Sequence, residues 1–169
     1  GLADLRKLEQ TLETQGFKIM ELVLHIGTEK TGTTSVQTWL EVNRFALSSS
    51  GVYLSELLDS PSNRALAHAF QNSVDPYFRP MGIMSMRQVN AYRDILTERL
   101  AAEIERASKT HDQFVISSEQ LQSRLLSEHE VARLASILKS LFREIKVVCY
   151  LRPQVEMRRS LYSTFVLQG

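Results

Sequence analysis

The sequence predicts an α/β fold in which helices cover both faces of a parallel β-sheet. Three short apolar runs, at residues 20–26, 113–117 and 144–151, alternate with segments of helical periodicity. Each run is largely continuous in its apolar character and does not alternate between apolar and polar residues, which is typical of strands buried on both faces. Together these patterns favour a three-layer α/β/α arrangement around a central parallel sheet.

Two helices are expected around the first strand. Leucines recur at helical spacing near the N-terminus, and Gly16 is a residue type that readily ends a helix, so residues 2–15 should form a short amphipathic helix. Residues 35–43 (SVQTWLEVN) have helical character directly after the loop that follows the strand. The order strand, loop, helix is therefore predicted for the first part of the fold.

The middle of the chain contains irregular segments and one long helix. Residues 48–63 and 76–84 are rich in turn-forming residues and are expected to be irregular, while residues 64–71 could form two helical turns between them. An apolar stripe from Val89 to Ala107 predicts a long helix over residues 85–107.

The last part of the chain should repeat the alternation of helix and strand. A capping-box pattern, Ser127-Glu-His-Glu130, precedes an apolar stripe and marks the start of another helix. A final helix should begin near Pro153, because proline suits the first turn of a helix.

Composition indicates one globular domain and restricts the sites it can carry. The 169 residues are 43% hydrophobic and 23% charged, enough to bury one core. Twenty Lys and Arg residues balance nineteen Asp and Glu residues, so the chain lacks the strong positive field of a protein that binds nucleic acid through its phosphates. The single cysteine, Cys149, excludes a disulfide framework and a multi-thiolate metal site, and we expect it to be buried in strand 144–151. No apolar run approaches the roughly 20 residues that span a bilayer, and a cytoplasmic location is expected.

The loop after the first strand carries the clearest functional pattern. It reads Gly-Thr-Glu-Lys-Thr-Gly-Thr-Thr from Gly27 to Thr34. Gly27 and Gly32 let the backbone turn tightly, so that successive amides point into the turn at a helix N-terminus, where free N–H groups and the helix dipole favour an anion. Threonine hydroxyls and the charge of Lys30 add donors for the same oxygens. The loop therefore predicts a phosphate-binding site.

This loop departs from the pattern of ATP- and GTP-binding proteins. The glycine spacing matches G-x-x-x-x-G-K-[ST], but position 33 is threonine, and the lysine of the loop is Lys30. Neither later strand ends in an aspartate suited to magnesium. An ATP-dependent P-loop kinase acting on a small molecule is therefore a disfavoured alternative.

The same loop resembles that of the sulfotransferases that use 3′-phosphoadenosine 5′-phosphosulfate, in particular their bacterial and glycan-modifying members. That family's 5′-phosphosulfate loop has the core Lys-[Thr/Ser]-Gly-Thr-[Thr/Ser], which this chain matches from Lys30 onward. The resemblance implies a P-loop-like topology and a reaction without a metal. It implies that Lys30 contacts the 5′-phosphate and the bridging oxygen, and that Thr31, Gly32, Thr33 and Thr34 bind the 5′-phosphate oxygens.

A second motif follows the last predicted strand. Residues 147–162 (VVCYLRPQVEMRRSLY) resemble the family's 3′-phosphate motif, in which an arginine just beyond a strand is followed eight residues later by a helical serine. Arg152 and Ser160 have this spacing. An arginine at the carboxyl end of a parallel strand can hold a phosphate through two hydrogen bonds, and a nearby hydroxyl can complete the site. The resemblance implies that this pair binds the 3′-phosphate.

Three residues are candidates for the general base that removes the proton of the acceptor, a step for which the family uses histidine or glutamate. His68 lies in a stretch where bacterial relatives carry histidines, and Glu56 follows the loop at about the distance of a glutamate base in the glycan-modifying branch. Glu119 follows the second strand at a sheet end near the cofactor. Each has a structural alternative: a surface histidine, a solvent-exposed carboxylate and a residue at a helix N-terminus. His25, inside a strand, is expected to be structural.

These motifs predict a sulfotransferase that moves a sulfuryl group from 3′-phosphoadenosine 5′-phosphosulfate to a hydroxyl or amine of a glycan, a glycolipid or a small metabolite. A catalytically silent nucleotide-binding or interaction module of the same fold is the alternative from a different class. The resemblance covers residues 22–165, and family domains continue beyond the 3′-phosphate helix. We therefore expect residues 1–169 to form a single sulfotransferase-like domain that is incomplete at its C-terminus.

Overall fold

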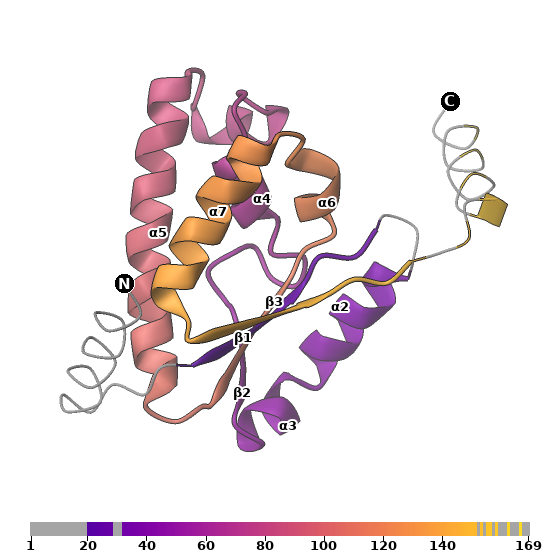
Figure 1. Cartoon of the computed structure of the whole chain (residues 1–169), viewed down its shortest axis with the longest axis vertical. Helices are drawn as coiled ribbons and strands as arrows, with labels where there is room; N and C mark the ends of the chain where they lie inside the picture. The colour runs from indigo at the N-terminus through magenta and orange to yellow at the C-terminus, as the bar shows by residue number, and fades with distance from the viewer. Residues whose placement is uncertain are drawn as a thin grey trace.

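The computed structural model shows an α/β protein built on a four-stranded parallel sheet (Figure 1). The structure describes residues 20–28 and 32–151, together with residues 153, 155, 156, 158, 162 and 166. The strand order is β2-β3-β1-β4, and every neighbouring pair is parallel. The strands are β1 (Glu21–His25), β2 (Val52–Leu54), β3 (Gln113–Ser117) and β4 (Glu144–Val148). The predicted α/β class and parallel sheet are thus confirmed, with β1 inside the sheet between β3 and β4.

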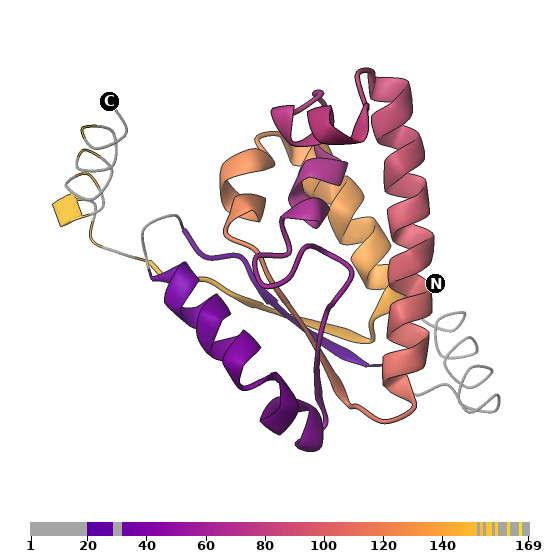
Figure 2. The ribbon, with the colours of Figure 1, turned by 180° about the vertical axis from the view of Figure 1, so that it is seen from behind.

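Helices lie on both faces of this sheet (Figures 1 and 2). On one face are α2 (Thr33–Val42) and α3 (Arg44–Ser49). On the other are α4 (Arg64–Phe70), α5 (Met86–Ser108), α6 (Gln120–Arg124) and α7 (Glu128–Leu141), and the 3₁₀ helix η1 (Pro76–Met81) joins α4 to α5. This is a three-layer arrangement. The predicted helix at residues 2–15 lies outside the described residues.

The two central strands divide their side chains between these layers. Leu22 and Leu24 of β1 are buried in the core formed with α4, α5 and α7, together with Phe114 and Ile116 of β3. Because successive side chains of a strand point to opposite faces, the intervening residues face α2. His25 of β1 pairs in register with the last residue of β3 on that side. The carboxyl ends of both strands therefore present polar side chains beneath α2.

The capping box predicted for α7 is present. The Ser127 hydroxyl accepts from the Glu130 amide, and the Glu130 carboxylate accepts from the Ser127 amide at 2.9 Å. The same carboxylate also accepts from the amide of Asn72 at 2.6 Å. Burial opposes ionisation of Glu130, but these backbone hydrogen bonds outweigh it and lower its pKa. One acidic side chain thus starts α7 and fixes the segment that follows α4.

Two sequence-based expectations about strands are wrong. Residues 52–54 form β2, although residues 48–63 were expected to be irregular, because pairing with β3 extends a three-residue segment too short to show a periodic pattern. Strand β4 is not buried on both faces: none of its five residues is buried, and Val147 is exposed. Cys149 follows β4 and is exposed, so the expected buried thiol is also wrong.

None of the helices within the described residues is long and apolar enough to cross a membrane.

Candidate functional site

The candidate site lies where β1 leads into α2. Residues 29–31 of the connecting loop, including Lys30 and Thr31, lie outside the described residues. Gly32 occupies the N-cap position of α2 with φ of 84°, and its carbonyl accepts from the amides of Ser35 and Val36. No side chain caps this helix within the described part of the chain. Its N-terminus therefore presents the amide donors and the positive dipole end that favour an anion.

Gly27 brings the two ends of the loop close together. Its φ is +27°, a backbone conformation that residues with a side chain rarely adopt. A Cβ added at this position would overlap the Cγ2 methyl of Thr33 and would lie 3.3 Å from Nε2 of His25. The start of the loop can pack against the start of α2 and the end of β1 only because residue 27 has no side chain.

Gly27→Ala should therefore destabilise the protein by about 1–3 kcal/mol, since it combines backbone strain with a steric overlap. Gly82→Ala is the matched control, because Gly82 also has a positive φ, of 68°, but an added Cβ would meet no atom within 4 Å. Urea denaturation of the two variants measures the difference. An equal loss of stability in both would show that the packing of Gly27 against Thr33 is unimportant.

A carboxylate stands next to the start of α2. Thr33 is buried, and its Oγ1 donates a hydrogen bond to Oε2 of Glu119, which follows β3. Glu119 occupies the N-cap position of α6, but its side chain makes no capping hydrogen bond there. The structure thus joins one threonine of the predicted phosphate loop to one of the three candidate bases. Thr34 lies beside Thr33 and is exposed.

A buried network holds the end of β3 against β1 and α2. Nδ1 of His25 lies 2.8 Å from the Ser117 hydroxyl, and the His25 ring meets Tyr150 edge-on with centroids 5.4 Å apart. The Ser117 amide donates to Oδ1 of Asn63 at 2.8 Å, and the Ser117 carbonyl accepts from Gln37 of α2 at 3.4 Å. These bonds fix the strand end from which Glu119 projects.

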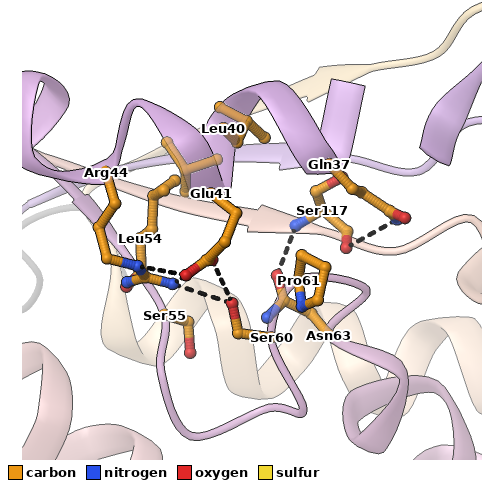
Figure 3. Close-up of a pocket in the computed structure, with 11 residues that line it drawn as sticks. Gln37, Leu40, Glu41, Arg44, Leu54, Ser55, Ser60, Pro61, Asn63 and Ser117 are labelled. Atoms are coloured by element: carbon orange, nitrogen blue, oxygen red, sulfur yellow. Dashed lines mark hydrogen bonds and ion pairs between the residues drawn. The ribbon is translucent and has the colours of Figure 1, made fainter. Parts of the chain in front are cut away.

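The segment after β2 lies beside this network and is joined to it by hydrogen bonds (Figure 3). Arg44 donates to Oε2 of Glu41 at 2.8 Å and to the hydroxyl of Ser60 at 2.9 Å, and that hydroxyl donates to the same Glu41 oxygen. The space enclosed between α2, residues 55–63 and β3 is only about 10 Å³. Because this cavity can hold at most one water molecule, it is too small to bind a ligand.

The structure places His68 away from these contacts. It is buried in α4, and its ring stacks on Tyr77 with centroids 4.3 Å apart. Its Nδ1 lies 3.4 Å from Oδ1 of Asp75. Burial lowers the pKa of His68, and the charge of Asp75 partly offsets this. His68 is therefore a buried packing residue, although the structural alternative considered from the sequence was a surface histidine.

Glu56 also lies apart from Thr33. Its carboxylate is exposed and stands 3.7 Å from Nη1 of Arg44. It lines a hollow of about 310 Å³ against α5, together with Arg99 and Arg106. Within the described part of the chain, neither Glu56 nor His68 forms a hydrogen bond or ion pair with the loop, whereas Glu119 contacts it directly. Arg152 and Ser160 lie outside the described residues.

The buried histidines make stability depend on pH. Burial lowers the pKa of both His25 and His68, with partial offsets from Glu119 and Asp75. Because the folded pKa lies below the unfolded value of about 6.5, the unfolded chain binds more protons as the pH falls. Their contribution is fully present above pH ~6.5 and is lost as the pH falls through the folded pKa.

We therefore expect the urea midpoint to decrease between pH 7.5 and 5.5, and His68→Gln to reduce that dependence. His129→Gln is the control, because His129 is exposed in α7 and should leave the wild-type profile unchanged. A flat wild-type profile, or an equally steep one for His68→Gln, would contradict the assignment of His68 as a neutral buried residue.

No family model, no curated protein and no solved structure matches this chain. Within the described residues, no group of three or more His, Cys, Asp and Glu side chains could hold a metal ion.

Proposed function

We propose that the protein is a sulfotransferase that binds 3′-phosphoadenosine 5′-phosphosulfate and transfers its sulfuryl group to a hydroxyl or amine of a glycan, a glycolipid or a small metabolite. The observation that carries the proposal is the contact between Thr33 and Glu119. It places a carboxylate beside a glycine-bounded loop and an uncapped helix N-terminus, at the carboxyl end of a parallel sheet. Ligands of open α/β sheets bind at this end.

The position of β4 supports a role for the second motif. Strand β4 lies beside β1, and the Ile26 amide donates to the Val148 carbonyl at 2.9 Å. The Thr28 hydroxyl donates to the carbonyl of Tyr150 at 3.2 Å. Arg152 follows Tyr150 by two residues in the chain. The second motif therefore contains, just before Arg152, a residue that contacts the first loop. In the proposed site, Arg152 and Ser160 bind the 3′-phosphate while the loop binds the 5′-phosphosulfate.

The proposed reaction needs three contributions from the protein. Loop amides and Thr33 hold the donor in line with the acceptor, and Lys30 stabilises the negative charge that develops on the bridging oxygen. The acceptor oxygen or nitrogen bonds to sulfur as the bond from sulfur to the phosphate oxygen breaks, which releases 3′-phosphoadenosine 5′-phosphate. The acceptor's proton passes to Glu119, which we prefer to Glu56 and His68 because it alone of the three contacts the loop in the described structure.

Nucleotide binding tests this proposal against the kinase alternative. We expect the protein to bind 3′-phosphoadenosine 5′-phosphate in the presence of a chelator, and to show no magnesium-dependent binding of ATP. The opposite preference would favour a P-loop kinase. Binding of the desulfated nucleotide without sulfuryl transfer to any member of a broad acceptor panel would instead favour the silent module.

A further inference from the structure

One nitrogen of His25 is buried without a partner. The side chain is 4% exposed, and its Nδ1 lies 2.8 Å from the Ser117 hydroxyl. Its Nε2 has no hydrogen-bond partner in the described structure. Buried polar atoms are almost always hydrogen-bonded, and each exception calls for an explanation such as a bound ligand. Nδ1 of His25 is therefore used in a hydrogen bond within the protein, whereas Nε2 is available to bind a ligand.

The available nitrogen lies close to Gly27 and to the start of α2. A Cβ built on Gly27 would lie 3.3 Å from Nε2 and would also overlap the methyl of Thr33. The nitrogen thus lies next to the start of the loop, where Gly27 packs against the first residue of α2. The neighbouring Ser118 hydroxyl is fully buried and also lacks a hydrogen-bond partner among the described residues, and the Ser118 amide donates to the His25 carbonyl at 2.9 Å. Two unsatisfied groups therefore occur at the paired ends of β1 and β3.

The environment of Ser117 indicates which ring nitrogen carries the proton. Ser117 is 2% exposed, and the contact with Nδ1 is its one described hydroxyl bond. If Nδ1 carried the hydrogen, the buried hydroxyl proton would have no acceptor. Donation from the Ser117 hydroxyl to Nδ1 satisfies both groups and places the hydrogen on Nε2. The free nitrogen is therefore a donor, which suits an anionic oxygen.

We propose that His25 is a further ligand-binding residue, whose Nε2–H donates a hydrogen bond to a phosphate or sulfate oxygen of a donor bound at the N-terminus of α2. This inference rests on the proposed function and adds a residue to that site. Burial, the larger effect, lowers the pKa of His25, and the carboxylate of Glu119 partly offsets it. The neutral ring donates one directed hydrogen bond and adds no positive charge to the site.

Two substitutions separate the roles of the two nitrogens. The amide of His25→Asn can replace Nδ1 and keep the bond to Ser117, but it cannot reach the position of Nε2. The longer amide of His25→Gln can supply a donor near the position of Nε2. We expect His25→Asn to weaken the binding of 3′-phosphoadenosine 5′-phosphate about ten- to hundredfold, and His25→Gln to retain most of it. His129→Asn, at an exposed position of α7, should bind like the wild type.

Nitrogen-15 NMR of the wild-type histidines tests the contact without any substitution. We expect the free protein to show the His25 tautomer with hydrogen on Nε2, and the Nε2 resonance to shift when 3′-phosphoadenosine 5′-phosphate is added, while His129 stays unchanged. Unmoved His25 resonances in a protein that binds the nucleotide, or equal affinities of His25→Asn and wild type, would overturn the role of His25 and leave the proposed function intact. Absence of nucleotide binding by the wild type would overturn both.

Discussion

Glu119→Gln is expected to lower sulfuryl transfer by about 10²–10⁴-fold while the protein still binds 3′-phosphoadenosine 5′-phosphate. Glutamine keeps the size of the side chain and can still accept from the Thr33 hydroxyl, but it cannot take the proton of the acceptor. The substitution also removes a negative charge close to the anion site. Binding of the nucleotide should therefore be unchanged or tighter, and a loss of turnover with retained affinity is the signature of a base.

Turnover with a labelled donor and calorimetric titration measure the two effects separately. Glu98→Gln is the matched control, because Glu98 is exposed on α5, and its variant should behave as wild type. Glu56→Gln and His68→Gln test the other two candidates under the same conditions. Full activity of Glu119→Gln, or a larger loss of turnover in Glu56→Gln, would show that Glu119 is not the general base.

Lys30→Ala should lower turnover by about 10²–10³-fold, because charge that develops on the bridging oxygen would lose its positive partner. Unlike Glu119→Gln, it should also weaken nucleotide binding, since in the proposed site the Lys30 ammonium group would contact the 5′-phosphate in the ground state. Lys30→Arg should restore part of the affinity but less of the turnover, because a planar guanidinium cannot occupy the position of an ammonium group.

Lys139→Ala provides the control for a loss of positive charge elsewhere, since Lys139 is exposed in the last turn of α7. It should match the wild type in both measurements. If Lys30→Ala and Lys139→Ala show the same turnover and the same nucleotide affinity, the loop after β1 does not bind the sulfuryl donor.

The long elements of the fold could be predicted from the sequence because their signals are local. The stripe from Val89 to Ala107 and the capping box at Ser127 are complete within single segments. Helix α5 begins and ends within one residue of the prediction, and α7 begins directly after Ser127. The run at residues 113–117 likewise matches β3. Strand β2 could not be predicted, because three residues show no period and only pairing with β3 makes them a strand. The exposure of Cys149 could not be predicted either, because it depends on the position of β4 at the end of the described strand order.

The candidate site likewise combines residues that the sequence identifies with residues that only the fold reveals. Gly27, Gly32 and the threonines of the loop are identifiable from their spacing in one segment. The choice of Glu119 from three candidate bases required the contact with Thr33, which joins residues 86 positions apart in the chain. His25 was expected to be structural, and its bond to Ser117 fits that view. That its Nε2 has no hydrogen-bond partner among the described residues depends on the register of β1 with β3 and on the position of Gly27, which the sequence does not show.

The most direct test of the proposed donor site is a calorimetric titration with 3′-phosphoadenosine 5′-phosphate in the presence of a chelator, performed on the wild type, Lys30→Ala and Arg152→Ala. We predict saturable submillimolar binding by the wild type and about tenfold or greater weakening in each variant, because each loses a charge-assisted contact to a different phosphate. No heat of binding at submillimolar nucleotide, or the same affinity in all three proteins, would contradict the proposal.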